Sequence, residues 1–456
     1  MTREFDAIVI GAGQAGPPLA GRLTDAGRTV AVIERKLVGG TCVNYGCIPT
    51  KTLVASAHAA HIARRSADFG VFTGEVTVDM AKVKARKDEI STGDRRGVES
   101  WIENMPGATL IRGHARFEDA HTVRVGDEVL TAPQIFLNTG GRATIPNIPG
   151  LDEVDYLTNV GVLDLDVLPE HLVVVGGSYI ALEFAQMYRR FGARVSVVER
   201  GSRLTAREDT DVSAAIKDIL EAEGIEVHLD ATDMRVAKTD TGFDLHLGGG
   251  AQPVSGSHLL VATGRRPNTD DLGLDAAGVQ TDDRGYVVVD DQLRTTAEGI
   301  WAMGDCNGKG AFTHTSYNDF EIVAANLLDD DPRRVSDRIS TYALYIDPPL
   351  GRAGMTVDEV RRSGRRALVA TRPMTRVGRA VEKGETQGFM KVVVDAETER
   401  ILGAAILGVG GDEVVQDILD VMTADLPYTA ISRTMHIHPT VSELVPTLLQ
   451  GLEPLE

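Results

Sequence analysis

Two of the chain's three cysteines stand together in the stretch GGTCVNYGCIPTK, which runs from Gly39 to Lys51. Four residues separate Cys42 from Cys47, and three interpretations are open: buried free thiols, a metal site or a redox pair. A metal site would need two more ligands nearby, and the stretch supplies none. A redox pair would gain from a helix start, where backbone N–H groups stabilise a thiolate. The spacing alone leaves the structural and redox interpretations about equally supported.

The stretch MHIHPTVSELVP, near the C-terminus, carries the second set of reactive side chains. His438 and Glu443 could act as a proton carrier in which the carboxylate orients the imidazole. The alternative for Glu443 is a structural capping box, because Thr440-x-x-Glu443 has the required spacing. His436 has no comparable carboxylate neighbour, and we assign it no chemical role.

These side chains need elements that hold them beside a reaction partner, and GAGQAG provides the first. Gly11, Gly13 and Gly16 have the spacing of a dinucleotide fingerprint, in which glycines permit a tight turn and a close approach of pyrophosphate. The motif follows a short apolar run and opens a helical pattern, so helix-terminal N–H groups would bind the anion. Glu34, at the end of the next β-rich run, would bind the ribose hydroxyls.

The pattern of this first unit occurs twice in the chain. FDAIVIGAGQAGPPLAGRLTDAGRTVAVIER begins at Phe5, and HLVVVGGSYIALEFAQMYRRFGARVSVVER begins at His171. Each consists of a β-rich run, a glycine turn, a helical pattern and a second β-rich run ending in Glu-Arg. The first glycine and the glutamate are 23 positions apart in both copies. This is the strand–turn–helix–strand core of a nucleotide-binding unit, and it predicts two dinucleotide sites.

The second fingerprint is degraded but usable. Gly176 is kept, while Ser178 and Ala181 replace the other two glycines with small residues. A structural unit without ligand is the alternative, and the repeated glutamate spacing disfavours it. Glu199 favours a free 2′-hydroxyl, hence NADH over NADPH. The basic residues that could instead accept a 2′-phosphate are Arg200, Arg203 and Arg207.

Later segments return the backbone to each site. IFLNTGGR contains Thr139 and Gly140, LLVATGRRPN contains Gly264, and GIWAMGD ends at Asp305. We therefore expect an α/β protein with two Rossmann-like dinucleotide-binding domains and a C-terminal α+β domain. The expected division is 1–149 and 271–337 for the first nucleotide domain, 150–270 for the second, and 338–456 for the C-terminal domain.

The composition excludes several other classes. The formal net charge of −19 opposes binding to nucleic acid. No apolar run reaches the roughly 18 residues of a membrane span, so no membrane association is expected. Three cysteines in 456 residues, without a recognisable secretory signal, indicate a reducing compartment and a cytoplasmic location.

Together these motifs resemble the class I pyridine nucleotide–disulfide oxidoreductases, a family that includes dihydrolipoyl dehydrogenase, glutathione reductase and mercuric reductase. The resemblance covers nearly the whole chain, through GAGQAG, GGTCVNYGCIPTK, NTGGR, GGSYIALEFA, ATGRRPN, WAMGDC and HIHPTVSE. It implies FAD in the first unit and NADH or NADPH in the second, with NADH favoured. It also implies a homodimer with shared active sites, a small-molecule or metal-ion electron acceptor, and no resident metal ion.

The resemblance also implies roles for individual residues. Cys47 would lie against the flavin, Cys42 would meet the substrate, and the two would form a disulfide that opens during turnover. Lys51 and Glu183 would pair near the flavin, and Tyr179 would gate the nicotinamide pocket. His438 and Glu443 would serve the cysteines of the other subunit. The residues implied in FAD binding are Gly11, Gly13, Gly16, Glu34, Gly40, Thr41, Thr139, Gly140 and Asp305. Those implied in nicotinamide nucleotide binding are Gly176, Ser178, Tyr179, Glu199, Arg200 and Gly264.

Within the family, DPPLGRAGMT and GIWAMGDCNGKGAFTHTSYNDFEIV look most similar to a bacterial subgroup that responds to reactive chlorine and reduces copper(II) or similar thiophilic ions. No cysteine follows Cys306, so the C-terminal pair of a dedicated mercuric reductase is absent. The resemblance favours reduction of a thiophilic metal ion or a small disulfide. The alternatives are a dihydrolipoyl dehydrogenase of a 2-oxoacid dehydrogenase complex and a low-turnover flavoprotein redox sensor.

Overall fold

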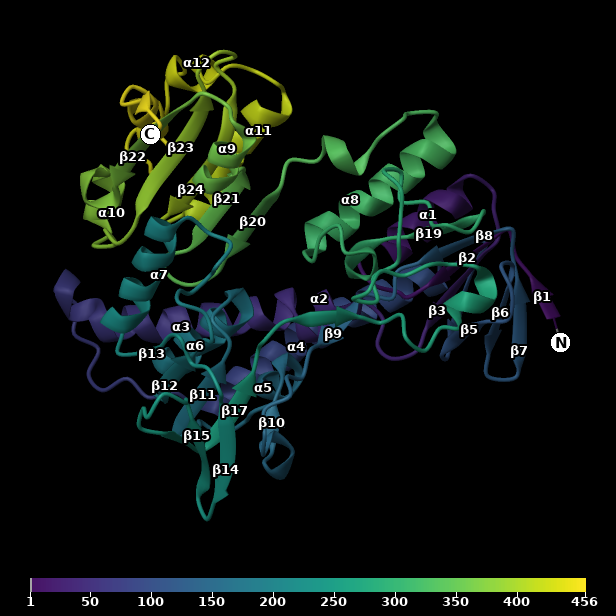
Figure 1. Ribbon diagram of the computed structural model, residues 1–456, viewed down its shortest axis with the longest axis horizontal. Helices are drawn as coiled ribbons and strands as arrows, with labels where there is room; N and C mark the ends of the chain where they lie inside the picture. Colours follow the sequence, from purple (N-terminus) through teal and green to yellow (C-terminus); the bar gives the residue numbers. More distant parts are fainter. Residues whose placement is uncertain (1) are drawn as a thin grey trace.

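The first nucleotide unit is built on a five-stranded parallel sheet. The computed structural model describes residues 2–456, and Figure 1 shows this sheet at the N-terminal end of the molecule. Its apolar runs are buried on both faces, as parallel strands covered by helices require. In spatial order the strands are β19 (Ile300–Ala302), β8 (Gln134–Leu137), β2 (Ala7–Ile10), β3 (Val30–Glu34) and β4 (Ala108–Arg112). The strand β19 joins from far along the sequence, which means that this unit resumes after the second.

The second nucleotide unit repeats this arrangement. Its parallel sheet has the order β10 (Tyr156–Leu157), β17 (His258–Val261), β11 (His171–Val175), β12 (Arg194–Val198) and β13 (Glu226–His228). In both sheets the strand before the fingerprint lies between the next strand and a strand that returns later. The predicted internal repeat is therefore confirmed, and so is the α/β class.

Smaller sheets decorate and join the two units. One four-stranded sheet contains β1 (Thr2–Glu4), β7 (Glu128–Thr131), β6 (Thr122–Val125) and β5 (Ala115–Phe117). A three-stranded sheet contains β14 (Arg235–Thr239), β15 (Gly242–His246) and β16 (Val254–Gly256). The antiparallel pair β9 (Gly141–Ala143) and β18 (Arg265–Pro267) crosses from one unit to the other.

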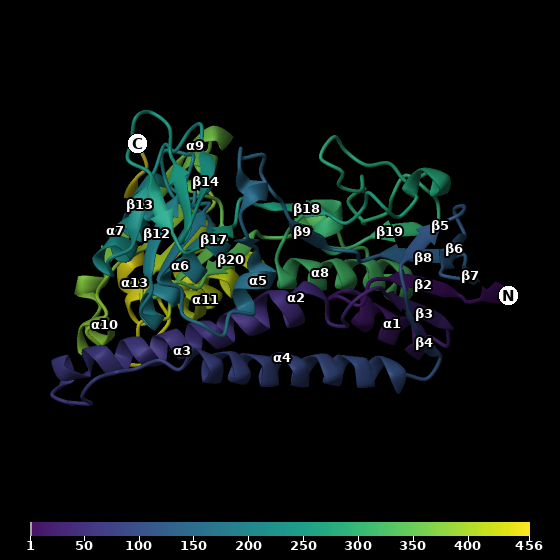
Figure 2. The ribbon, with the colours of Figure 1, turned by 90° about the horizontal axis from the view of Figure 1, so that it is seen from below.

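Two long helices connect the units along one side of the molecule (Figure 2). The helix α3 (Cys47–Arg65) packs against α4 (Met80–Glu103) and also against α6 (Tyr179–Phe191), which belongs to the second unit. Because α3 begins at Cys47 and contacts α6, the helix that carries Cys47 lies at the junction of the two units. The remaining helices of this half are α1 (Gly16–Asp25), α2 (Gly40–Tyr45), α5 (Asn159–Leu163), α7 (Thr210–Ala222) and α8 (Thr313–Ala324).

The C-terminal part is an antiparallel sheet flanked by helices. The sheet order is β20 (Thr341–Leu344), β21 (Leu350–Gly354), β24 (Ile401–Leu407), β23 (Phe389–Asp395), β22 (Ala367–Pro373) and β25 (Glu453–Pro454). Its helices are α9 (Val357–Ser363), α10 (Gly378–Glu382), α11 (Gly411–Thr423), α12 (Thr429–Ser432) and α13 (Leu444–Leu449). This is the expected α+β texture. Among the described residues, no helix is both long and apolar enough to cross a membrane.

Candidate active site

One continuous cavity of about 2960 Å³ reaches both glycine fingerprints and the cysteine stretch. Its wall includes Gly11 of the first unit, Gly176 of the second, and both Cys42 and Cys47. Cavities for drug-sized ligands are roughly 300–1,000 Å³, so this one has room for two dinucleotides. The two nucleotide sites and the thiols therefore share one space.

The first fingerprint is locked to its sheet by close backbone contact. A Cβ on Gly11, whose φ is +107°, would lie 2.2 Å from the Asn138 carbonyl oxygen. The Asn138 side chain accepts a hydrogen bond from the Gly16 N–H at 3.1 Å. A Cβ on Gly16 would lie 2.3 Å from the Gly11 carbonyl oxygen, so this third glycine packs helix against turn. These positions tolerate no side chain, which explains the glycine spacing.

The rim of the first site suits a flavin dinucleotide. The Glu34 carboxylate accepts hydrogen bonds from the N–H groups of Ala12, at 3.0 Å, and Lys36, at 2.8 Å, which fix it at the cavity wall. Gly140 lines the cavity with open space where its Cβ would be. The remaining residues implied by the resemblance that line this space are Gly13, Gly40, Thr41, Thr139 and Asp305. The cradle fits FAD.

The second site has the same construction. A Cβ on Gly176 would lie 2.4 Å from the Ala262 carbonyl oxygen, which repeats the Gly11 contact. Glu199 accepts a hydrogen bond from the Gly201 N–H at 2.8 Å, and Gly264 lines the cavity beside open space. Ser178, Tyr179 and Arg200 complete the wall. The site fits a nicotinamide dinucleotide.

The basic residues near Glu199 are not equivalent. Arg200 and Arg207 line the cavity. Arg203 instead donates to the Thr210 hydroxyl at 2.8 Å and to the Ala206 carbonyl at 2.9 Å. Two of the three arginines are thus placed where a 2′-phosphate could reach them.

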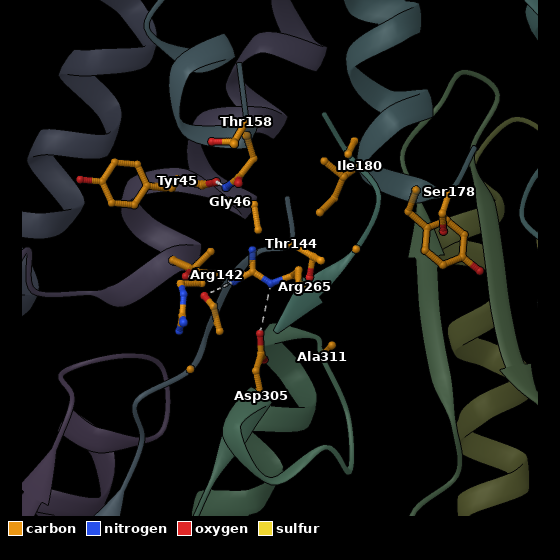
Figure 3. Close-up of a pocket in the computed structure, with 18 of the residues that line it drawn as sticks. Tyr45, Gly46, Arg142, Thr144, Thr158, Ser178, Ile180, Arg265, Asp305 and Ala311 are labelled. Atoms are coloured by element: carbon orange, nitrogen blue, oxygen red, sulfur yellow. Dashed lines mark hydrogen bonds and ion pairs between the residues drawn. The ribbon is translucent and has the colours of Figure 1, made fainter. Parts of the chain in front are cut away.

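An ion pair joins the units at the floor of the cavity. Arg265 Nε lies 3.5 Å from Asp305 Oδ2, as Figure 3 shows with the dashed line between these side chains. Burial raises the pKa of the Asp305 carboxyl, and the Arg265 guanidinium opposes that shift. Asp305 follows β19, and Arg265 begins β18, so the pair fixes the last strand of the first unit against the crossover from the second.

The two cysteines differ in their surroundings. Cys42 lies within α2, whereas Cys47 opens α3, and both are free thiols in this structure. Cys47 Sγ lies 3.0 Å from the Thr313 hydroxyl. The hydrogen bond from Cys42, with smaller effects from Thr313 and Lys51, lowers the pKa of Cys47 to about 6. The same thiol pair raises the pKa of Cys42, so Cys47 is the thiolate of the two.

A second ion pair stands behind Cys47. Lys51 Nζ lies 2.6 Å from Glu183 Oε2, and the Glu183 side chain is 6% exposed. The other Glu183 oxygen accepts from the Tyr345 backbone N–H at 3.0 Å, and the Lys51 ammonium lies 4.4 Å from the centre of the Tyr345 ring. The pair thus connects α3, α6 and the C-terminal part at one point.

His438 and Glu443 lie outside the cavity of their own chain. His438 Nδ1 is 2.9 Å from Glu443 Oε2, and the His438 side chain is 81% exposed. Thr440 Oγ1 accepts from the Glu443 N–H, but the carboxylate contacts His438, and α13 begins only at Leu444. The full capping box is therefore not formed.

Several contacts in the site were not anticipated from the sequence. Asn138 lies in IFLNTGGR and Arg265 lies in LLVATGRRPN, so the motifs themselves are a signal by which these two residues could be found. Thr313 and Tyr345 carry no local pattern, because each meets its partner across a distance in sequence that only folding closes. Thr313 is 266 positions from Cys47 in the sequence, and Tyr345 is 162 positions from Glu183.

Two nucleotide cradles around a dithiol, with a separate C-terminal sheet domain, define a flavin-dependent disulfide reductase. The family model "Pyridine nucleotide-disulphide oxidoreductase" matches residues 5–319, and the model of its dimerisation domain matches residues 340–449. The chain belongs to this family of FAD- and NAD(P)H-dependent enzymes and forms homodimers.

The chain is similar to relatives with three different names. The chain is 37% identical to "Probable pyridine nucleotide-disulfide oxidoreductase RclA" of Escherichia coli, over 96% of this chain and 97% of that protein. A solved structure described as the Cu(II) complex of that HOCl-induced flavoprotein disulfide reductase matches with a TM-score of 0.90, 36% identity, and coverage of 98% and 99%. A mercuric reductase of Streptomyces lividans is 35% identical, over 96% and 94% of the two chains. Dihydrolipoyl dehydrogenase 2 of Haloarcula marismortui is 34% identical, over 98% and 96%.

Proposed function

We propose that the protein uses NAD(P)H to reduce a thiophilic metal ion of the copper(II) or mercury(II) type, or a small disulfide, through Cys42 and Cys47. The observation that carries this proposal is the asymmetry of the two thiols within the cavity shared by both nucleotide cradles. The copper(II) complex of the E. coli relative and the mercuric reductase relative support a metal-ion acceptor. The proposed domain division is 1–149, 150–270, 271–337 and 338–456, and the proposed location is the cytoplasm.

The electron balance defines what each thiol does. One NAD(P)H and one proton reduce the Cys42–Cys47 disulfide to two thiols and yield NAD(P)⁺. When bound, FAD relays these two electrons from the nicotinamide to the disulfide. Two copper(II) ions, or one mercury(II) ion, then accept the two electrons from the thiols, the disulfide re-forms, and two protons leave. With a disulfide substrate, Cys42 attacks one sulfur, the substrate releases its other thiol, and Cys47 resolves the mixed disulfide.

The proposed roles of the other residues follow from this cycle. The Lys51–Glu183 ion pair would place a positive charge near Cys47, and Tyr179 would gate the nicotinamide pocket. His438, oriented by Glu443, would hold and return the Cys42 proton of the partner subunit. NADH is the proposed preferred donor, because Glu199 would repel a 2′-phosphate.

A steady-state panel tests the acceptor class. The wild type, Cys42→Ser and the control Cys306→Ser are compared with NADH and with copper(II), mercury(II), lipoamide, glutathione disulfide and a quinone. Cys306 is fully buried, does not line the cavity, and donates its thiol to the Met303 carbonyl at 3.3 Å, a contact that a serine hydroxyl can also make, so this variant should behave as wild type. Acceptors that lose at least about a hundredfold in rate with Cys42→Ser belong to the dithiol route. If no acceptor depends on Cys42, the proposed cycle is wrong.

The rival function is that of a dihydrolipoyl dehydrogenase, which the Haloarcula relative represents. It predicts NAD⁺ reduction by dihydrolipoamide at rates above those with any metal ion. A low-turnover redox sensor predicts slow turnover with every acceptor in the panel. Both outcomes are distinct from the one expected here.

A further inference from the structure

A buried carboxylate stands behind the nicotinamide side of the cavity. Glu208, in the loop before α7, has a fully buried side chain. Its Oε1 atom accepts hydrogen bonds from two phenols, Tyr179 at 2.8 Å and Tyr342 at 2.7 Å. Tyr179 is the first residue of α6 and lines the cavity, whereas Tyr342 lies on β20 of the C-terminal sheet.

The charge of Glu208 is compensated from the C-terminal sheet. Arg352 Nη1 lies 3.8 Å from Glu208 Oε2, and its side chain is 2% exposed. Arg352 is the direct cross-strand partner of Tyr342, so both side chains leave the same face of the β20–β21 pair. A buried carboxylate is tolerated only when it is paired and hydrogen-bonded, and this one obtains its cation and one of its two hydrogen bonds from the C-terminal domain.

The neighbouring acid anchors the same loop. Asp209 Oδ2 lies 3.5 Å from Arg352 and 3.1 Å from Lys391 Nζ. Lys391 also reaches Asp211 at 2.6 Å, within the first turn of α7. Figure 1 shows α7 next to the C-terminal sheet. The loop that carries Glu208 is therefore held by this sheet.

The Tyr179 ring is also packed from the side. Its centre lies 5.4 Å from that of Tyr342 and 6.3 Å from that of Phe312, and Phe312 stacks on Tyr342 at 5.4 Å. Burial, and the Glu208 charge, raise the pKa of the Tyr179 phenol, so it remains a donor. Tyr179 lines the cavity, whereas Glu208 lies behind its wall. The hydrogen bond to Glu208 therefore directs the Tyr179 hydroxyl into the wall and away from the cavity space.

We propose that Glu208 is a positioning residue that holds Tyr179 against the cavity wall, and that the C-terminal domain sets this position through Tyr342 and Arg352. The nicotinamide pocket stays open because the phenol is held. Without the hydrogen bond, the ring can rotate into the space that the nicotinamide needs. The inference rests on the proposed function, since it takes Tyr179 as the nicotinamide gate.

The test follows reduction of the bound flavin by NADH in single turnovers, a step that precedes the cysteines and any acceptor. Glu208→Met, which removes the acceptor but keeps a side chain of similar length, and Tyr179→Phe are compared with Tyr188→Phe, a control on the same helix whose hydroxyl donates to the Val162 carbonyl at 2.6 Å. A hydrogen bond to a charged group is worth about tenfold in an equilibrium. Each gate variant should raise the half-saturating NADH concentration about 5- to 10-fold, while the limiting rate stays within about twofold.

The double variant should raise that concentration no further than either single variant, because both remove one interaction. Tyr188→Phe should leave it unchanged even where the protein loses stability. Unchanged NADH saturation in both gate variants, or an additive double variant, overturns the inference. If NADH does not reduce the wild-type flavin at all, the proposed function itself fails, which is a different result. Should Glu208→Met not fold, Tyr179→Phe alone decides, since it removes only a hydroxyl.

Discussion

Lys51 Nζ lies 2.6 Å from Glu183 Oε2 and so joins the helix of the reactive cysteine to the helix of the second fingerprint. The ammonium is also one of the groups that lower the pKa of Cys47. Glu183 is the buried member of the pair, and it receives the Tyr345 N–H as well. The pair therefore links the thiol, the nicotinamide unit and the C-terminal domain.

Removal of Lys51 should affect both charge and stability. Lys51→Met leaves Glu183 without its cation, and we expect the free energy of unfolding to fall by about 1–3 kcal/mol, less than for a fully buried pair because Lys51 is partly exposed. The pKa of Cys47 should rise. Chemical denaturation and thiol alkylation measure the two effects. The control is Lys217→Met, which removes an ion pair with Glu221 in which the lysine is as exposed as Lys51 but the carboxylate, unlike that of Glu183, is exposed to solvent. Equal behaviour of the two variants would contradict the assigned importance of the pair.

Alkylation of the reduced protein should depend on pH. Thiolate is the reactive species, and the pKa of Cys47 is lowered to about 6 from 9.0, so its thiolate fraction is lost as pH falls through about 6. Thr313→Val removes one stabilising hydroxyl and should shift the midpoint upward. The experiment records iodoacetamide labelling of Cys47 by mass spectrometry across the pH range in a Cys42→Ala background and in the wild type. The Cys42 hydrogen bond is the largest cause of the lowered pKa, and alanine cannot donate it, so the midpoint should also rise in Cys42→Ala. A midpoint near 9 in the wild type would refute the asymmetry.

The exposed His438 leads to a prediction about subunits. If His438 serves the partner's thiols, a heterodimer of one Cys42→Ser and one His438→Ala protomer retains one intact site and loses the other. Separately tagged protomers, purified as the heterodimer, should show about half of the wild-type rate, whereas each variant homodimer is nearly inactive. If His438 acted within its own chain, the heterodimer would be as inactive as its parents.

Glu199 predicts which nicotinamide nucleotide, NADH or NADPH, is the preferred electron donor. We expect kcat/KM for NADH to exceed that for NADPH by about tenfold, because the carboxylate accepts ribose hydroxyls and repels a phosphate. Glu199→Gln should narrow this ratio, since Arg200 and Arg207 remain at the cavity wall. Glu226→Gln is the charge-matched control, because Glu226 pairs with Arg194 and does not line the cavity. A wild type that prefers NADPH would show that the arginines dominate.

The sequence by itself determined the elements whose signal is local. The glycine spacing, the apolar runs and the repeat of 23 positions predicted both parallel sheets, and β19 joined the first as expected. These features are readable because a tight turn and a buried strand each impose a residue type at a fixed spacing. The linear sequence also identified Cys42 and Cys47 as the candidates for chemistry.

Tertiary structure decided which groups meet. The spacing of the cysteines left the structural and redox interpretations equal. Their asymmetry arises mainly from the hydrogen bond between the two thiols, with a smaller effect from Thr313, which is 266 positions from Cys47. Tyr179 was recognised, but its hydrogen bond to Glu208 and the pairing of Glu208 with Arg352 have no signature in the sequence. Such contacts depend on how three domains pack, and a pKa or a side-chain position is set by distances that only packing fixes.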